Sequence, residues 1–383
     1  MADARPYDLV LFGATGFTGG LIAHYLARRL ADGRIRWALA GRSREKLSKL
    51  RRELEREDPR MAELGLIEAT SDDPESLRAM AGSTRAIITT VGPYQQHGEP
   101  LVAACVDQVC DYFDLTGEPS WWRSIVERYH ERARARDVIL VPCCGFESVP
   151  HDLGALFTAH QLPRDQPMTI DCYVSAKGTF SGGTLASALG EMPKGVKRGA
   201  GGGGGPRGPK QAKPKLHFVD ALGVWAVPAP TIEPLVVRRS ASLVPDFGGE
   251  LQFREYFAFR SALTMAKTIV GLGGVAALAS FAPTRRLLQR IRPQGTGPSP
   301  EARARAWFRI DFVGRAAGRE VRTHVSGGDP GYDETAKMIS EAAITAIEDR
   351  ERLPLRGVLT PASALGMPLI ERLRAAGIEF AVD

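Results

Sequence analysis

The 383-residue sequence predicts an α/β protein, with a doubly wound parallel sheet followed by a second domain built on a mixed sheet. Two observations predict this class. Short apolar runs alternate with amphipathic stretches of helical length through the first 145 residues. Beyond them the regularity ends, and strand patterns of alternating polar and apolar residues follow. A chain of this length has room for two or three domains.

The apolar runs of the first part are short and are expected to be buried strands. Between them apolar residues recur every three or four positions, as in Leu21, Tyr25 and Leu26. Such alternation is typical of parallel strands joined by helices that cover both faces of a sheet, with a ligand at the carboxyl ends of the strands. The six expected strands are residues 7–12, 35–40, 64–69, 86–91, 111–115 and 138–141.

The second part alternates like half-buried strands over residues 168–175, 251–258 and 306–313. A helix is expected from Asp333 to about Arg350, another from Pro361, and a short strand over 378–382. We therefore expect three units, which are a nucleotide-binding domain (1–145), a substrate and dimerisation domain (146–330) and a C-terminal segment (331–383).

The net charge of +6 is local. Seven basic residues and no acidic ones lie in residues 194–215, and the rest of the chain is close to neutral. Six glycines within 199–205 predict that this basic segment is a flexible loop. Because the excess charge belongs to one loop, we do not expect a nucleic acid partner.

Cysteine usage and the N-terminal residues bear on the compartment. The five cysteines form neither a disulfide framework nor the paired spacing of a zinc site, so no metal site is predicted. The first residues carry no apolar leader before the strand pattern begins. We expect a reduced, cytoplasmic compartment.

An apolar segment, residues 262–284, interrupts the second part. Residues 268–284 carry no charge, but three glycines and Pro283 make the run too short for a spanning helix. Two interpretations are open. One is a buried helix or a homodimer face. The other is an interfacial segment over 262–292 that rests on a membrane, where Arg285, Arg286, Arg290 and Arg292 meet anionic headgroups.

A glycine motif joins the first expected strand to the first helix. Glycines at the GxxGxxG spacing permit a tight turn and a close approach of the backbone to a pyrophosphate, while the helix N-terminus offers free amides. The motif predicts a dinucleotide site. Its residues are Gly13, Ala14, Thr15, Gly16, Phe17, Thr18 and Gly19.

The second strand indicates which dinucleotide binds. A cofactor without a 2′-phosphate would need an acidic residue at the end of this strand, but the sequence has Arg42 and Ser43 there. An arginine suits a 2′-phosphate because its guanidinium group can bind phosphate with two parallel hydrogen bonds. NADP(H) is therefore the predicted cofactor.

The fourth strand leads into a loop that should lie over the ribose and the nicotinamide. The loop contains Val91, Gly92, Pro93 and Tyr94, all expected to contact the cofactor. Tyr94 and His97 are candidate proton donors, and a structural role is an equal alternative for each. Tyr173 and Lys177 imitate a Tyr-xxx-Lys catalytic pair, but a strand there would hold the two side chains roughly 13 Å apart.

Several motifs together resemble the saccharopine dehydrogenase-like oxidoreductases. They are Gly13-Ala-Thr-Gly-Phe-Thr-Gly19, Ala40-Gly-Arg42, Val91-Gly-Pro-Tyr-Gln95, Tyr112-Phe-Asp-Leu-Thr-Gly-Glu118 and Cys144-Gly-Phe-Glu-Ser-Val-Pro-His-Asp152. Ser181-Gly-Gly-Thr184 and Gly357-Val-Leu-Thr-Pro-Ala-Ser363 look most like the trans-acting enoyl reductases within that family. The resemblance implies a dinucleotide domain, a second mixed α/β domain, and a C-terminal segment that packs back on the first.

The resemblance also implies an activity. The subgroup reduces a carbon–carbon double bond in acyl chains of polyketide or fatty-acid synthases, in the biosynthesis of lipids and glycolipids. An acyl thioester is the expected substrate, whether free or bound to a carrier protein, and a peripheral position at the plasma membrane would give the apolar segment a purpose. Two alternatives stay open, a saccharopine-type dehydrogenase acting on an amino-acid-derived substrate and a non-catalytic NADPH-binding protein on a lipid surface.

Reduction of an enoyl thioester needs a hydride at the β-carbon, a donor for the enolate oxygen and a proton for the α-carbon. The expected catalytic residues lie near the carboxyl ends of the strands. They are Tyr94, His97, Glu147 and Ser148, with His151 as a further candidate. For Glu147 and Asp152, capping of the helix that follows the sixth strand is an equal alternative.

Overall fold

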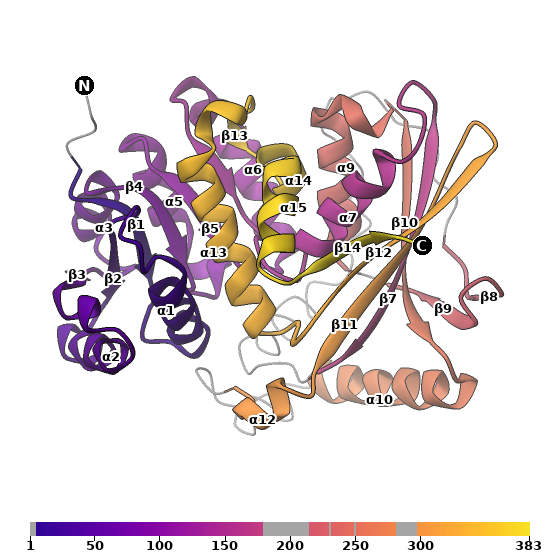
Figure 1. Ribbon diagram of the computed structural model, residues 1–383, viewed down its shortest axis with the longest axis horizontal. Helices are drawn as coiled ribbons and strands as arrows, with labels where there is room; N and C mark the ends of the chain where they lie inside the picture. The colour runs from indigo at the N-terminus through magenta and orange to yellow at the C-terminus, as the bar shows by residue number, and fades with distance from the viewer. Residues whose placement is uncertain (1–4, 179–213, 230, 249, 281–296) are drawn as a thin grey trace.

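Two seven-stranded sheets organise the computed structural model, which describes residues 5–178, 214–229, 231–248, 250–280 and 297–383 (Figure 1). Most of the predicted basic loop, the Ser181–Thr184 motif and the arginines at 285–292 lie outside these residues. So does the end of the predicted apolar segment, residues 281–284.

The first sheet is parallel throughout, with the strand order β13-β6-β5-β4-β1-β2-β3. The six strands predicted for the first domain are confirmed, with bounds shifted by at most two residues. The order reverses between β1 and β4, which makes the carboxyl edge beside β1 the switch point where such sheets bind ligands. The strands are β1 (Tyr7–Phe12), β2 (Trp37–Gly41), β3 (Gly65–Glu68), β4 (Thr84–Thr89), β5 (Asp111–Asp114), β6 (Ile139–Val141) and β13 (Gly357–Val358).

Helices cover both faces of this sheet, as the alternation predicts. Along β1, Leu9 and Leu11 enter one core with α1 and α13, whereas Val10 and Phe12 enter another with α3, α5 and α6. The helices are α1 (Phe17–Arg29), α2 (Arg44–Glu57), α3 (Pro74–Gly82), α4 (Tyr94–His97), α5 (Glu99–Asp107), α6 (Pro119–Ala135) and α13 (Asp333–Glu348).

The second sheet is mixed, with the order β14-β12-β11-β7-β10-β9-β8. Only β7 and β10 pair in parallel, and the other neighbours are antiparallel. The strands are β7 (Met168–Lys177), β8 (His217–Val219), β9 (Val224–Pro228), β10 (Leu251–Phe259), β11 (Trp307–Ala316), β12 (Arg319–Gly327) and β14 (Glu379–Val382). The predicted mixed sheet is confirmed, and Tyr173 and Lys177 do lie along a strand.

Helix α7 (Val149–Ala159) is buried along its whole length, packed against β11 and β12 of the second sheet. It also contacts α9 (Glu233–Leu243), α14 (Pro361–Ala364) and α15 (Gly366–Ala375). Because α7 is the next element after β6, it connects the carboxyl edge of the first sheet to the core of the second.

The C-terminal segment divides between the two sheets. Helix α13 packs on α1, and β13 pairs with β6, which confirms the return to the first domain. The last strand, β14, instead pairs with β12 of the second sheet. The short strand β13 adds a seventh member to a sheet for which six strands were expected.

Helix α10 (Ala262–Ser280) lies across the lower end of the second sheet in Figure 1, beside α12 (Pro300–Arg303). Leu263, Ile269 and Val270 are 65%, 44% and 74% exposed. The buried-helix interpretation is therefore wrong for these side chains. Within the described part of the chain, no helix combines the length and apolar character that crossing a membrane requires.

Candidate functional site

Close packing demands glycine at two positions of the turn between β1 and α1. Gly13 has a φ of +86°, and a Cβ there would lie 2.6 Å from Oγ1 of Thr90. A Cβ on Gly19 would lie 2.2 Å from the carbonyl oxygen of Gly13. Only glycine at positions 13 and 19 therefore lets the turn pack against the end of β4 and the first turn of α1.

The N-terminus of α1 is open to a ligand. Gly16 is its N-cap and no side chain caps it, and the first turn carries no acidic residue. Thr15 and Gly16 are exposed, and Phe17 and Thr18 are partly exposed. Ala14 is buried and donates its N–H to the carbonyl of Ala40 at 3.2 Å. The first amides of a helix lack intrahelical partners, so this end can bind an anion.

Arg42 follows β2 at the same edge as the turn, since Phe12 and Ala40 are register partners in β1 and β2. Its side chain is exposed and, within the described residues, forms no hydrogen bond or ion pair. Ser43 is the N-cap of α2, where its Oγ accepts a hydrogen bond from the Lys46 N–H at 3.4 Å. Arg42 is thus free to bind a phosphate, while Ser43 already has a structural partner.

The loop after β4 lies against the glycine turn, because Thr90 donates its N–H to the Phe12 carbonyl at 3.0 Å. Val91 and Pro93 are half-buried and Gly92 is exposed. This arrangement brings two of the predicted cofactor segments together, Gly13–Gly19 and Val91–Tyr94.

Tyr94 is buried, and its hydroxyl has two backbone partners. It donates to the Thr89 carbonyl at 3.1 Å and accepts from the Leu115 N–H at 3.2 Å. Burial, with the charge of Asp114, raises the pKa of this hydroxyl well above its usual value. His97 lies at the edge of the site, with its Nδ1 4.0 Å from Asp72. The catalytic roles of Tyr94 and His97 stay predictions.

Asp114 ends β5 and organises the loops at the carboxyl edge. Its Oδ1 accepts hydrogen bonds from the N–H groups of Thr116 and Cys143, both at 2.9 Å. Its Oδ2 accepts from the Tyr112 hydroxyl at 2.7 Å. Burial raises the pKa of Asp114 to about 6. Sequence reasoning did not single out this residue.

Glu147 lies just beyond β6, with its carboxyl group over Gly145. A Cβ on Gly145 would be 2.7 Å from a Glu147 oxygen. Oε1 is buried and has no hydrogen-bond partner. Burial, with contributions from Asp114 and Glu233, raises the pKa of Glu147 to about 8. The carboxyl group is therefore mostly protonated at neutral pH, as a proton donor must be.

Ser148 and Asp152 take structural positions in α7. Ser148 is the N-cap of the helix, and its hydroxyl donates to the Cys143 carbonyl. Asp152 accepts from the Ser240 hydroxyl at 2.5 Å and from the Ala362 N–H at 2.8 Å. No side chain caps α7, so helix capping by Glu147 or Asp152 is wrong. A catalytic role for Ser148 stays a prediction.

Three buried side chains next to this edge form a group that sequence reasoning did not assemble. His151 of α7, Glu233 of α9 and Glu255 of β10 offer ligand atoms that all lie within 4.8 Å of one another. His151 Nε2 is 3.4 Å from Glu255 Oε1. Burial raises the pKa of both glutamates and lowers the pKa of His151 to about 3. The composition predicted no metal site, yet these residues can hold an ion.

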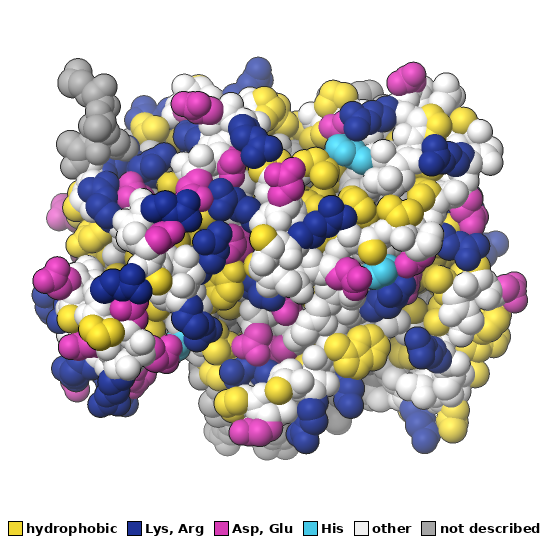
Figure 2. Space-filling view, viewed as in Figure 1, with side chains coloured by type: hydrophobic (Ala, Val, Ile, Leu, Met, Phe, Trp, Pro, Cys, Tyr) yellow, Lys and Arg dark blue, Asp and Glu magenta, His cyan; other side chains and the backbone are white. Residues whose placement is uncertain are grey.

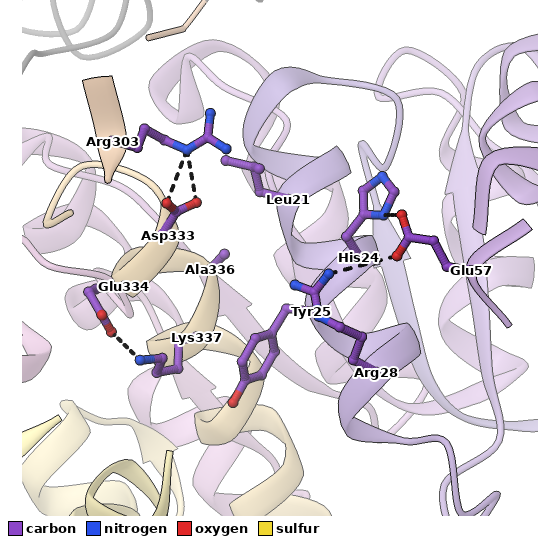
Figure 3. A pocket seen from close by; sticks show the side chains of 10 residues that line it. All are labelled: Leu21, His24, Tyr25, Arg28, Glu57, Arg303, Asp333, Glu334, Ala336 and Lys337. Carbon is purple, nitrogen blue, oxygen red and sulfur yellow. Dashed lines mark hydrogen bonds and ion pairs between the residues drawn. The ribbon is translucent and has the colours of Figure 1, made fainter. Parts of the chain in front are cut away.

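A pocket of about 600 Å³ lies between α1 and α13 (Figure 3). Its charged side chains pair with one another, as in Lys337 with Glu334 at 2.7 Å and Arg303 with Asp333 at 2.9 Å. Tyr25 donates to the buried Glu341 at 2.6 Å. Because these charged groups already pair with one another, the carboxyl edge of the first sheet is the better candidate site for a ligand.

Comparisons with known proteins agree with this architecture. Residues 9–141 match the saccharopine dehydrogenase NADP binding domain. A Mycobacterium tuberculosis protein provisionally named a trans-acting enoyl reductase is 36% identical, over 99% of this chain and 98% of its own. A trans-acting enoyl reductase of Mycobacterium leprae is 32% identical, over 98% of this chain and 97% of its own.

Among solved structures, apo saccharopine dehydrogenase (L-Glu forming) from Saccharomyces cerevisiae superposes with a TM-score of 0.57. The match covers 98% of this chain and 100% of the yeast chain, at 12% identity. At that identity the similarity concerns the fold.

Proposed function

Because the chain belongs to the saccharopine dehydrogenase-like oxidoreductases, we propose that it reduces a carbon–carbon double bond of a polyketide or fatty-acyl thioester, as a trans-acting enoyl reductase in lipid or glycolipid biosynthesis. The chain is an NADP-dependent oxidoreductase, because residues 9–141 match the saccharopine dehydrogenase NADP binding domain and relatives that match its full length are named enoyl reductases. The chain's own residues support the finer assignment to an enoyl reductase.

The residues at the carboxyl edge fit NADP(H). The turn leaves no space for a Cβ at Gly13 or Gly19, and the open N-terminus of α1 suits a pyrophosphate. Arg42 is exposed and unpaired among the described residues, so its guanidinium group can bind a 2′-phosphate. When bound, NADPH supplies the hydride that an enoyl β-carbon accepts.

The observation that carries the proposal is Glu147. Its half-buried side chain lies at the same edge of the sheet as the glycine turn, with a buried Oε1 that has no partner. Glu147 would donate the proton to the α-carbon of the substrate. Tyr94, His97 and Ser148 stay as further candidates, whereas the N–H groups of Phe146 and Ser148 already donate to Thr335 Oγ1 and to the Gly145 carbonyl.

The charges around Glu147 favour a thioester over an amino acid. Saccharopine-type substrates carry carboxylates, which need cationic partners. In the described residues no lysine or arginine forms an ion pair with Glu147, Glu233 or Glu255. A substrate carboxylate would find no cationic partner among these described side chains, whereas a thioester is uncharged and needs none.

The position of α10 supports a peripheral membrane location. The apolar side chains of Leu263, Ile269 and Val270 are exposed among the described residues, and a lipid surface would cover them. A homodimer that buries the same face is the alternative, and the two predict different results with lipid vesicles.

The proposal is tested by following NADPH absorbance with a medium-chain enoyl-pantetheine thioester, with the product identified by mass. We expect loss of NADPH that depends on the enoyl substrate, and a saturated product. Saccharopine-type substrates that consume NADPH in place of the thioester would favour the dehydrogenase. NADPH binding without turnover on free or carrier-bound thioesters would favour the non-catalytic protein on a lipid surface.

A further inference from the structure

The second sheet and its two covering helices bury three potential metal ligands at one point. His151 lies in the first turn of α7, Glu233 in the first turn of α9, and Glu255 in the middle of β10. Their exposed fractions are 1%, 8% and 3%. Residues so far apart in sequence, all polar and all buried, need a common reason to lie together.

From this arrangement we infer that His151, Glu233 and Glu255 bind a divalent transition-metal ion of the zinc class. Two ligands of one zinc ion in tetrahedral geometry lie roughly 3.4 Å apart. His151 Nε2 and Glu255 Oε1 have this separation, at 3.4 Å. The ligand atom of Glu233 lies within 4.8 Å of both, close enough for a small side-chain rotation to complete the set.

Unsatisfied hydrogen-bonding capacity is the second observation that points to an ion. Glu233 Oε2 is buried and has no hydrogen-bond partner. Thr231 reaches Glu255 Oε2 only at 3.4 Å. A buried carboxylate oxygen without a partner destabilises the folded protein, and a bound cation would remove that cost.

Charge balance supports the same conclusion. Neither glutamate pairs with a lysine or arginine anywhere in the described parts of the chain, so two carboxylates would face each other without a cation. One divalent ion would balance both carboxylates.

The donor set indicates the class of ion. An imidazole nitrogen with two carboxylates suits zinc, manganese or iron better than calcium, which prefers six to eight oxygens. Cys172 of β7 is the register partner of Glu255, and neighbouring residues of paired strands share a face of the sheet. Its buried Sγ is not among the atoms that lie within 4.8 Å of one another, so the thiol stays outside the set.

The test is metal analysis of the purified full-length protein, which needs no substrate and is independent of the reductase assay. We expect one equivalent of zinc, manganese or iron per chain, or one equivalent of Zn²⁺ bound after treatment with a chelator. Glu255→Gln and His151→Asn should each weaken Zn²⁺ binding by more than the 10- to 100-fold typical of outer-shell substitutions.

Two matched controls locate the ion. Glu341→Gln removes a buried glutamate of another region, and His324→Asn removes a histidine that lies 2.7 Å from Asp383. Both variants should keep the metal. An ion lost with His324→Asn but kept with Glu255→Gln would overturn the assignment.

The wild-type protein alone gives a second decision, should a ligand variant fail to fold. Co²⁺ added to the metal-free protein should produce visible absorption bands that saturate at one equivalent. If the purified protein held no metal and added Co²⁺ gave no visible absorption bands, the inference would be overturned. The three residues would then be a buried cluster that shares protons.

Discussion

Asp152 in α7 accepts a hydrogen bond of 2.8 Å from the backbone N–H of Ala362 in α14, across 210 residues of the chain. The Ser240 hydroxyl lies 2.5 Å from the other oxygen of Asp152 and also 2.5 Å from Oγ1 of Thr360. Segments 144–152 and 357–363 therefore meet at one carboxylate. The helix that follows Glu147 is held in place by the C-terminal segment.

Replacing Arg42 tests the choice of cofactor. We expect Arg42→Ala to raise the KM for NADPH about 10- to 100-fold, because about 1.5–3 kcal/mol of charged hydrogen bonding is lost. The KM for NADH should stay unchanged. Arg52→Ala, an exposed arginine of α2, is the matched control. Steady-state kinetics with both cofactors decide, and equal effects on NADPH and NADH would refute the phosphate contact.

Alanine variants of the adjacent Gly19 and Gly20 distinguish the effect of close packing from the effect of helix propensity. Gly19→Ala would place a Cβ 2.2 Å from the Gly13 carbonyl oxygen, and we expect it to abolish NADPH binding and destabilise the fold by about 1–3 kcal/mol. Gly20 has nothing within 4 Å of such a Cβ. Gly20→Ala should be neutral or stabilise by up to about 1 kcal/mol. Titration of NADPH by fluorescence and denaturant unfolding compare the two, and similar effects would contradict this account.

Glu147→Gln keeps the shape of the side chain and removes its acidic proton. We expect kcat to fall by about 10²–10⁴, with NADPH affinity unchanged, because only the proton transfer is lost. Glu341→Gln, which changes a buried glutamate bound to Tyr25, should keep its activity. If Glu147→Gln remained fully active and Tyr94→Phe did not, the proton donor would be Tyr94.

Asp114 should make stability depend on pH. Burial raises its pKa from 3.8 to about 6, so the folded protein binds this proton more tightly than the unfolded chain does. The stabilisation is present below about pH 4 and is lost as the pH rises through 6. It amounts to roughly 3 kcal/mol. Urea unfolding of wild type and Asp114→Asn from pH 4 to 7 should give stability curves whose difference changes by about this amount, and parallel curves would exclude the effect.

The apolar face of α10 can be changed without touching the core. The triple variant Leu263→Ser, Ile269→Ser and Val270→Ser should bind anionic vesicles at least about tenfold more weakly, because three exposed apolar side chains no longer enter the lipid. Phe218→Ser removes an exposed ring from β8 as a control. Vesicle sedimentation measures the partition. Unchanged partition, with a change of oligomeric state, would favour the dimer face.

The local features of this protein could be predicted from its sequence. Glycine spacing locates the turn at Gly13–Gly19, and apolar runs locate six strands of the first sheet, because both signals lie within a few consecutive residues. The strand β12 was missed, since charged residues such as Arg319, Glu320 and Arg322 interrupt its apolar pattern. The two-residue strand β13 is too short to show periodicity.

Long-range groupings were beyond the sequence. His151, Glu233 and Glu255 come from three elements, and nothing in their spacing relates them. One signal was available for Glu255, which occupies the inward register of β10 after Leu251 and Phe253. A charged residue on an apolar strand face indicates a special role, but the sequence does not show which residues it contacts.

Basic and acidic side chains are interspersed over the face seen in Figure 2, which agrees with the expectation that the excess charge belongs to one loop. The expected absence of a nucleic acid partner rests on that charge distribution and stays a prediction.

The strands β13 and β14 follow all the other described strands in the chain, yet each completes a different sheet. Until residues 357–382 emerge, β6 and β12 both present an unpaired edge, and such edges template aggregation. The first sheet can be completed once Gly357 and Val358 are made, and the second only later, once Glu379–Val382 follow. We expect nascent chains stalled before Gly357 to need chaperone protection at both edges.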